Sequence, residues 1–198
     1  MGEYVRTKVV PECDAYSLAK LAKIAETNGN NTGWDATKPF EIFYKMANGV
    51  YNKAGFDEEL VCFVSGSALA ALESSDEHKK IMNVTNSNGS IDTRIRKING
   101  ITLILVPDDR MKTAFTFSNS EDPRQGGFEV DDLAKNLDMM MLPKKAATLV
   151  KKTEKVRVFT PDENQTKDAY KFDYRIYYDI IVKASDAKTI QTATSAIA

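Results

Sequence analysis

The residues best suited to catalysis or metal binding are few and lie in separate segments of this sequence. His78 is the only histidine, and Cys13 and Cys62 are the only cysteines. A zinc site would need all three, and they lack the short, repeated spacing of known zinc ligand sets. The sequence also contains no phosphate-binding glycine loop, no HExxH and no CxxC motif. It therefore predicts no catalytic centre, no cofactor and no metal ion.

Two further groups could be mistaken for catalytic residues. Ser65-Gly66-Ser67 follows a short apolar run and superficially resembles the turn that carries a nucleophilic serine, but the GxSxG spacing is missing. We interpret Ser65 as a helix cap. Asp108 and Asp109 are adjacent, and neighbouring side chains on a helix or strand point in different directions. They do not form a carboxylate pair, and Asp108 is typical of turn or cap chemistry.

The element that dominates the sequence is the segment 168–185, DAYKFDYRIYYDIIVKAS. Its even positions are mainly apolar or aromatic and its odd positions are mostly charged, which predicts a β-strand with one face packed against another element. At about 3.3 Å per residue its stretch 170–183 extends about 45 Å, which is more than the roughly 40 Å diameter of a compact chain of this length. Tyr177 is an aromatic residue on the charged face and suggests a subunit contact. Our candidate residues for contacts between subunits are Asp173, Arg175, Tyr177 and Asp179.

Helical periodicity predicts two other long elements. Residues 2–26 are expected to form one long helix, which Pro11 must either bend or begin. Residues 37–55 follow a 3.6-residue period closely, with Thr37 as the cap and Gly55 at the end. The remaining expectations are a hairpin of strands 91–98 and 101–106 turning at Asn99-Gly100, strands at 60–64, 137–142 and 155–160, and a short helix at 144–151.

Composition is that of an ordinary soluble globular protein, with 42% hydrophobic and 28% charged residues. The formal net charge of −1 gives no global field that would attract nucleic acid or a membrane surface. No apolar run approaches the roughly 20 residues of a spanning helix, and the cysteine usage indicates a reducing compartment. These observations predict an α+β protein, with short strands and helices between two long terminal elements that pair with each other.

Several segments, taken in order, resemble one protein family. INGITLILVPDDRMKT (98–113), NLDMMMLP (136–143) and KVRVFTPDENQTKDAYKFDYRIYYD (155–179) resemble the C-terminal half of a tailed-bacteriophage or prophage major capsid protein. The opening EYVRTKVVPECDAYSLAKLA resembles the long spine helix of that family, including the proline. The resemblance implies the Hong Kong phage capsid fold, in which an axial domain is inserted into a peripheral domain. By this mapping the spine helix covers residues 1–32, the axial domain 33–165, and the long strand of the peripheral domain 166–198.

The resemblance also implies a function. A member of this family is a structural, non-enzymatic subunit of an icosahedral shell of hexamers and pentamers around packaged DNA, which it contacts only non-specifically. Its location would be the virion, and the bacterial host cytoplasm during assembly, with no membrane contact. Full-length members carry an arm and an extended loop before the spine helix, so we expect this chain to be a truncated fragment that is monomeric or weakly associating.

Two alternatives stay open at this point. A nanocompartment (encapsulin-like) shell protein has the same fold but encloses a cargo enzyme, and the neighbouring genes would separate it from a phage protein. A small cytosolic enzyme or ligand-binding domain without a recognisable motif is the other alternative. A deep apolar pocket with convergent polar groups would favour that one.

Overall fold

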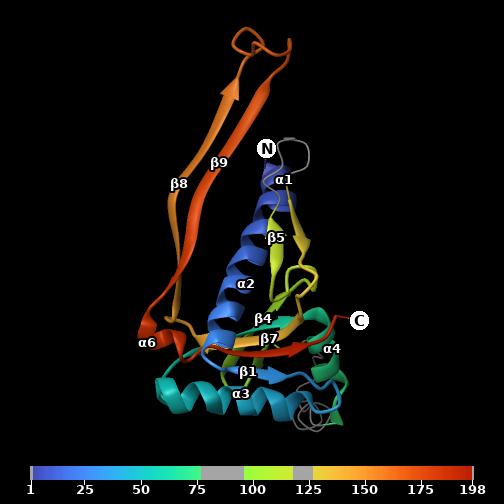
Figure 1. Cartoon of the computed structure of the whole chain (residues 1–198), viewed down its shortest axis with the longest axis vertical. Coiled ribbons are helices and arrows are strands. Elements are labelled where there is room, and N and C mark those ends of the chain that lie inside the picture. The colour runs from blue at the N-terminus through green and yellow to red at the C-terminus, as the bar shows by residue number, and fades with distance from the viewer. Residues whose placement is uncertain (1, 77–95, 118–126, 198) are drawn as a thin grey trace, which may run out of the picture.

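The computed structural model describes residues 2–76, 96–117 and 127–197 and is shown in Figure 1. A six-stranded mixed sheet forms the body, in the order β1-β10-β7-β2-β4-β3. His78 and the start of the predicted strand 91–98 lie outside the described residues. The body strands are β1 (Asn31–Gly33), β2 (Leu60–Ser65), β3 (Lys97–Ile98), β4 (Ile101–Val106), β7 (Asn136–Pro143) and β10 (Gln191–Ser195).

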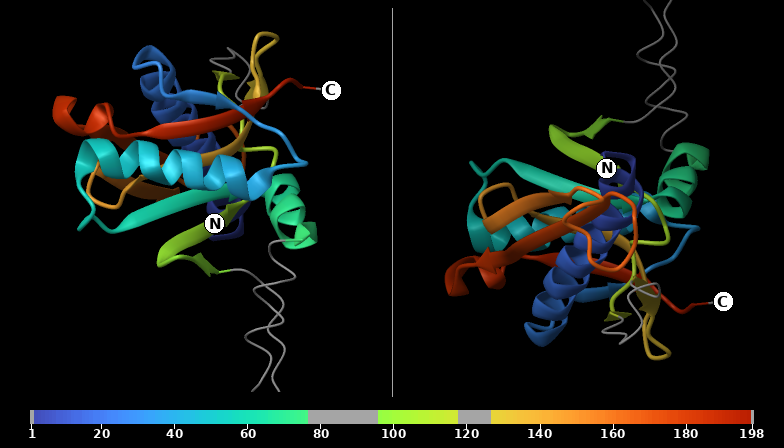
Figure 2. Two further views of the ribbon diagram at one scale, coloured as in Figure 1. Left: turned by 90° about the horizontal axis from the view of Figure 1, so that it is seen from below. Right: turned by 90° about the horizontal axis from the view of Figure 1, so that it is seen from above.

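Helices cover both faces of this sheet (Figure 2). Helices α3 (Pro39–Ala54) and α4 (Gly66–Ser74) pack on one face, and α2 (Val10–Thr27) packs on the other. The central strand β7 is buried on both sides, because Met139 and Met141 face α3 while Met140 and Leu142 face α2. Its continuous apolar run follows from this position. Among the described residues, no helix is long and apolar enough to cross a bilayer.

The long N-terminal helix continues through its proline. It comprises α1 (Gly2–Tyr4), the π-helical turn η1 (Val5–Val9) and α2, and the Val10 N–H donates to the Val5 carbonyl. Pro11 has no N–H, and in a regular α-helix its ring would clash with the carbonyl of Thr7. The wider π turn directly before Pro11 accommodates this ring, so the proline neither begins nor ends the helix.

Several local expectations are confirmed, and one is wrong in detail. Both residues of the Asn99-Gly100 turn have positive φ, 48° and 81°, as a two-residue hairpin requires. Helix α3 ends before Gly55, whose φ is 99°. Thr37, however, does not cap α3. Its backbone N–H and hydroxyl donate to the Asp35 carboxylate instead, at 2.9 and 2.7 Å.

The predicted helix at 144–151 is wrong, because these residues lead into a long strand. Strand β8 (Ala147–Phe159) pairs antiparallel with β9 (Lys171–Val182) along their lengths. A short apolar run such as ATLV is compatible with a helix or a strand, and pairing with β9 makes it a strand. Two strands also differ from the expected division into domains. Strand β8 falls within the expected axial range 33–165 but pairs with β9, and β10 falls within the expected peripheral range 166–198 but lies in the body sheet.

The remaining described elements are short. Strands β5 and β6 form a small antiparallel sheet beside α2, where the ring centroids of Tyr16 and Phe117 are 5.9 Å apart. Helix α6 connects the long hairpin to β10. These elements are β5 (Phe115–Phe117), β6 (Phe128–Val130) and α6 (Ala184–Ala187).

The structure confirms the capping role of Ser65. Its Oγ accepts a hydrogen bond from the Ala68 N–H at 3.1 Å, at the start of α4. The Asp108 carboxylate accepts from the backbone N–H groups of Gly66 and Ser67 at the same helix end. A Cβ on Gly66 would lie 3.0 Å from Asp108 Oδ1, so glycine permits this close approach. Both Ser65 and Asp108 therefore satisfy backbone donors of a helix.

Asp138 is a buried carboxylate at an irregularity of the body sheet. Ala193 pairs with Met139 but Thr194 pairs with Leu137, which leaves Asp138 as the extra residue of a β-bulge. Its side chain is buried, and Oδ2 has no hydrogen-bond partner in the described residues. Burial raises the pKa of Asp138, and a hydrogen bond from Ser195 partly opposes this effect. Ionised Asp138 therefore destabilises the fold.

We expect Asp138→Asn to have a pH-dependent effect on stability. Because the pKa of Asp138 is raised in the folded state, its cost appears as the pH rises above the ordinary value of 3.8 and is absent below it. At each pH we compare the free energy of unfolding of the variant with that of the natural chain. This difference should favour the variant more at pH 7 than at about pH 3.5, by on the order of 1 kcal/mol. Urea unfolding at both pH values measures this, with exposed Asp57→Asn as control. A difference that does not change with pH would contradict the prediction.

Candidate assembly surface on the β8–β9 hairpin

Strands β8 and β9 form a two-stranded sheet that projects from the body past the N-terminal end of the long helix (Figure 1). At about 3.3 Å per residue, β9 alone spans about 40 Å. No third strand joins the pair within the described parts of the chain. A lone two-stranded sheet is marginally stable in water, so this hairpin depends on what lies against its faces.

A β-bulge in β8 gives the hairpin one apolar and one charged face. Lys151 pairs with Tyr178 and Thr153 with Tyr177, which leaves Lys152 as the extra residue. Beyond the bulge, Val156 lies opposite Tyr174 and Val158 lies opposite Phe172. A regular register would place Lys155 and Arg157 in these positions instead. The extra residue therefore aligns the valines of β8 with the even-numbered, apolar face of β9.

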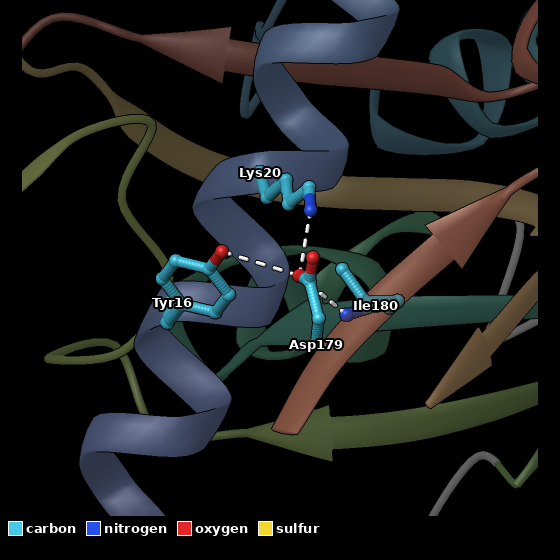
Figure 3. A network of polar contacts seen from close by, with 4 residues as sticks. All are labelled: Tyr16, Lys20, Asp179 and Ile180. Carbon is cyan, nitrogen blue, oxygen red and sulfur yellow. Dashed lines mark hydrogen bonds and ion pairs between the residues drawn. The ribbon is translucent and has the colours of Figure 1, made fainter. Parts of the chain in front are cut away.

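The root of the hairpin is fastened to α2 by a cluster of polar contacts (Figure 3) and by an aromatic contact. The Asp179 carboxylate accepts from Lys20 Nζ at 2.6 Å, from the Tyr16 hydroxyl at 3.2 Å and from the Ile180 N–H at 2.8 Å. The rings of Tyr16 and Tyr178 meet edge to face, with centroids 5.7 Å apart. The Lys20 hydrogen bond lowers the pKa of Asp179 and raises that of Lys20. These contacts set the direction in which the hairpin leaves the body.

Above this root, the apolar face of β9 and the long helix enclose a groove. Tyr178 contacts the Cys13 thiol, and burial raises the pKa of both groups. Further out, Phe172 is 55% exposed, so the expected packing of the even face on the helix holds only near the root. The groove has a volume of about 450 Å³ and is lined by Tyr4, Val9, Glu12, Cys13, Phe172, Tyr174, Ile176 and Tyr178.

Tyr174 is held at the edge of this groove by the opposite strand. Its hydroxyl donates to Glu154 Oε1 at 2.8 Å. Burial, followed by this hydrogen bond, raises the pKa of Tyr174 to about 12, while the same bond lowers the pKa of Glu154. The tyrosine hydroxyl therefore stays protonated at neutral pH and serves as a structural donor.

The predicted contact residues do not all lie together. Asp173, Arg175 and Tyr177 share the outer, charged face of the hairpin, where Arg175 donates to the Tyr177 hydroxyl at 2.8 Å and lies over its ring. Asp179 is at the root and is already paired with Lys20. The sequence interpretation missed the contribution of β8 to the same face, where Lys155 lies opposite Arg175. The alternation KVRV at 155–158 was a signal for it.

The cysteines lie in separate environments. Cys62 is fully buried in the core under α3, and burial raises its pKa, whereas Cys13 lines the groove. In the described part of the chain, no three histidine, cysteine or acidic side chains lie close enough together to hold a metal ion.

No family model and no curated protein sequence matches this chain. Its structure is similar to that of Mycobacterium phage Che8, with a TM-score of 0.62 and 14% identity over 93% of this chain and 58% of that chain. The mature capsid of bacteriophage PhiM1 gives 0.50 and 17%, over 83% and 50% of the two chains. The capsid of Cyanophage P-SCSP1u gives 0.52 and 11%, over 81% and 46%.

The chain has the fold of a phage major capsid protein. The α+β class and the capsid fold expected from the sequence are thus confirmed. The chain spans 46 to 58% of the length of the solved capsid-fold chains it matches. The assembly in which this chain takes part is therefore a proposal.

We expect Asp179→Asn to loosen the hairpin but not the body sheet of this capsid fold. The pKa of Asp179 is lowered in the folded state, so its stabilising effect is present above the ordinary value of 3.8 and is lost as the pH falls below it. Hydrogen exchange at pH 7 should be faster in β8 and β9 of the variant and unchanged in β7.

The control is Asp173→Asn, which alters the outer face and leaves the root intact. Equal exchange in the Asp179 variant and the natural chain would show that the tyrosine contacts alone hold the root.

Proposed function

We propose that this protein is a structural, non-enzymatic subunit of an icosahedral bacteriophage capsid that encloses packaged DNA. The observation that carries the proposal is the fold, a sheet body with a long helix and a projecting hairpin, which is similar to three phage structures. A projecting element with one charged, uncovered face suits contacts between copies in a shell. The subunits form hexamers and pentamers, in the virion and, during assembly, in the host cytoplasm.

The division into domains is also part of this proposal. The long helix, comprising α1, η1 and α2, forms the peripheral domain together with β8 and β9. The six-stranded sheet with α3 and α4 forms the axial domain. This division keeps the two expected domains but assigns β8 to the peripheral one and β10 to the axial one, because strands of one sheet share a structural unit.

The outer face of the hairpin is our proposed subunit contact. Arg175 and Tyr177 are exposed there, and Tyr177 holds the guanidinium in place. Asp173 lies on the same face, 3.7 Å from Lys171. Asp179 acts indirectly, by fixing the root. Contacts with DNA are non-specific and weak, since the chain carries a net charge of only −1.

The nanocompartment alternative requires the same fold. All three solved structures reported above come from phages, which favours the phage capsid.

Electron microscopy tests the proposal directly. The protein should be produced as its gene encodes it, with any residues that flank 1–198, and examined by negative stain over a range of concentrations. We expect closed shells, because copies of one chain that meet through the same interfaces form closed, symmetric assemblies. A protein that stays monomeric at every concentration contradicts the proposal.

The contact face has its own test in the same preparation. Arg175→Glu should raise the concentration needed for shell formation by about tenfold or more, since losing one good charged contact costs about 1.4 kcal/mol or more. Circular dichroism should show an unchanged fold. The matched control is Lys45→Glu, which reverses an exposed charge on α3. Normal shells from the Arg175 variant would exclude this residue from the interface.

A further inference from the structure

The outer half of the hairpin carries an unbalanced group of cations on its charged face, which we call the basic shaft. Four cations and one carboxylate lie on this face, and two of the cations, Lys155 and Arg175, are directly opposite each other in the register. Like charges in opposite positions of an antiparallel pair destabilise it. The basic shaft consists of Lys155, Arg157, Lys171, Arg175 and the carboxylate Asp173.

The rest of the described chain does not neutralise the basic shaft. Lys171 is 3.7 Å from Asp173 and lies over the Phe159 ring. Lys155, Arg157 and Arg175 form no ion pair with any carboxylate in the described residues. All three are exposed, and Arg175 is oriented by Tyr177 at 2.8 Å. The face is thus arranged for an anion from outside the molecule.

The loop that joins β8 to β9 has the opposite charge. We call residues 160–170 the acidic tip, because they carry three carboxylates and one lysine. Asp162, Glu163 and Asp168 are exposed, and none of them forms an ion pair with a cation in the described parts of the chain. Lys155 lies four residues before the end of β8, about 13 Å along the strand. In the described residues, the tip carboxylates form no ion pair with the shaft of their own hairpin.

We propose that the acidic tip of one copy docks on the basic shaft of a second copy, head to tail. This inference rests on the proposed function and specifies which surfaces meet. The hairpin projects clear of the body, so both surfaces are accessible (Figure 1). Contacts between two different surfaces generate closed rings when the rotation closes, as a shell requires. A nucleic acid lying along the hairpin fits less well, since the tip carboxylates repel phosphates.

Zero-length cross-linking of the 198-residue chain tests this contact. A water-soluble carbodiimide joins lysine amines to carboxylates that touch, and a mixture of ¹⁵N-labelled and unlabelled chains identifies links between copies. We expect heavy–light pairs between Lys155 and Asp162 or Glu163. The ion pairs Lys144–Glu59 and Lys145–Glu58 lie within one chain and supply the internal control, with heavy–heavy and light–light pairs only. Absence of heavy–light tip–shaft pairs at the highest attainable concentration overturns the proposal.

Charge reversal adds a second, independent measurement. Lys155→Glu with Arg157→Glu should reduce the heavy–light links between other residues of the two hairpins by about tenfold or more, as should Asp162→Lys with Glu163→Lys. All four changes in one chain should restore them, because attraction returns with exchanged signs. Lys23→Glu with Lys45→Glu, on exposed positions of α2 and α3, is the matched control. Failure of the four-change chain to recover, with its fold intact, overturns the proposal.

Three outcomes separate this inference from its alternatives and from the proposed function. If the shaft variant (Lys155→Glu with Arg157→Glu) loses binding to single-stranded DNA but keeps the heavy–light links, the basic shaft binds a polyanion and the inference is wrong. If shells form normally from the tip and shaft variants, the inference fails while the proposed function stands. If no shells form from the natural protein, the proposed function itself fails.

Discussion

The hairpin of this protein depends on the contact between its root and helix α2. Two strands alone cannot bury an apolar face, and β8–β9 has no third strand in the described residues. Its position is therefore set where Tyr16 and Lys20, one helical turn apart, meet Asp179 and Tyr178. Everything beyond that point, including the groove and the charged face, takes its direction from this contact.

Two β-bulges determine which side chains face which neighbour. In β7, the extra residue Asp138 allows Leu137 to share the α2 face with Met140 although the two are three positions apart. In β8, the extra residue Lys152 moves Val156 and Val158 onto the apolar face and Lys155 onto the charged one. Because side chains alternate with a period of two, a single inserted residue exchanges the faces of everything after it.

The result is a molecule with a stable body and an exposed arm of mixed character. The body buries β7 between helices on both faces and needs no partner for its core. The hairpin presents apolar side chains such as Phe172 and Val158, each more than half exposed, on one face, and charges on the other. This contrast is what we expect of a subunit whose folding is internal and whose outer surfaces become buried on assembly.

The sequence alone determined the elements with strong local signals. The alternation in 168–185, the helical period of 37–55 and the Asn99-Gly100 turn each predict a structure that is found, because each signal depends only on residues close together in the sequence. The ordered segments that resemble capsid proteins predicted the fold. Tertiary structure decided the rest: the first half of β8, which was expected to be a helix, is a strand because β9 offers it backbone partners, and Asp108 caps a helix formed 42 residues earlier. Such long-range pairings satisfy hydrogen bonds between segments whose proximity no local pattern encodes.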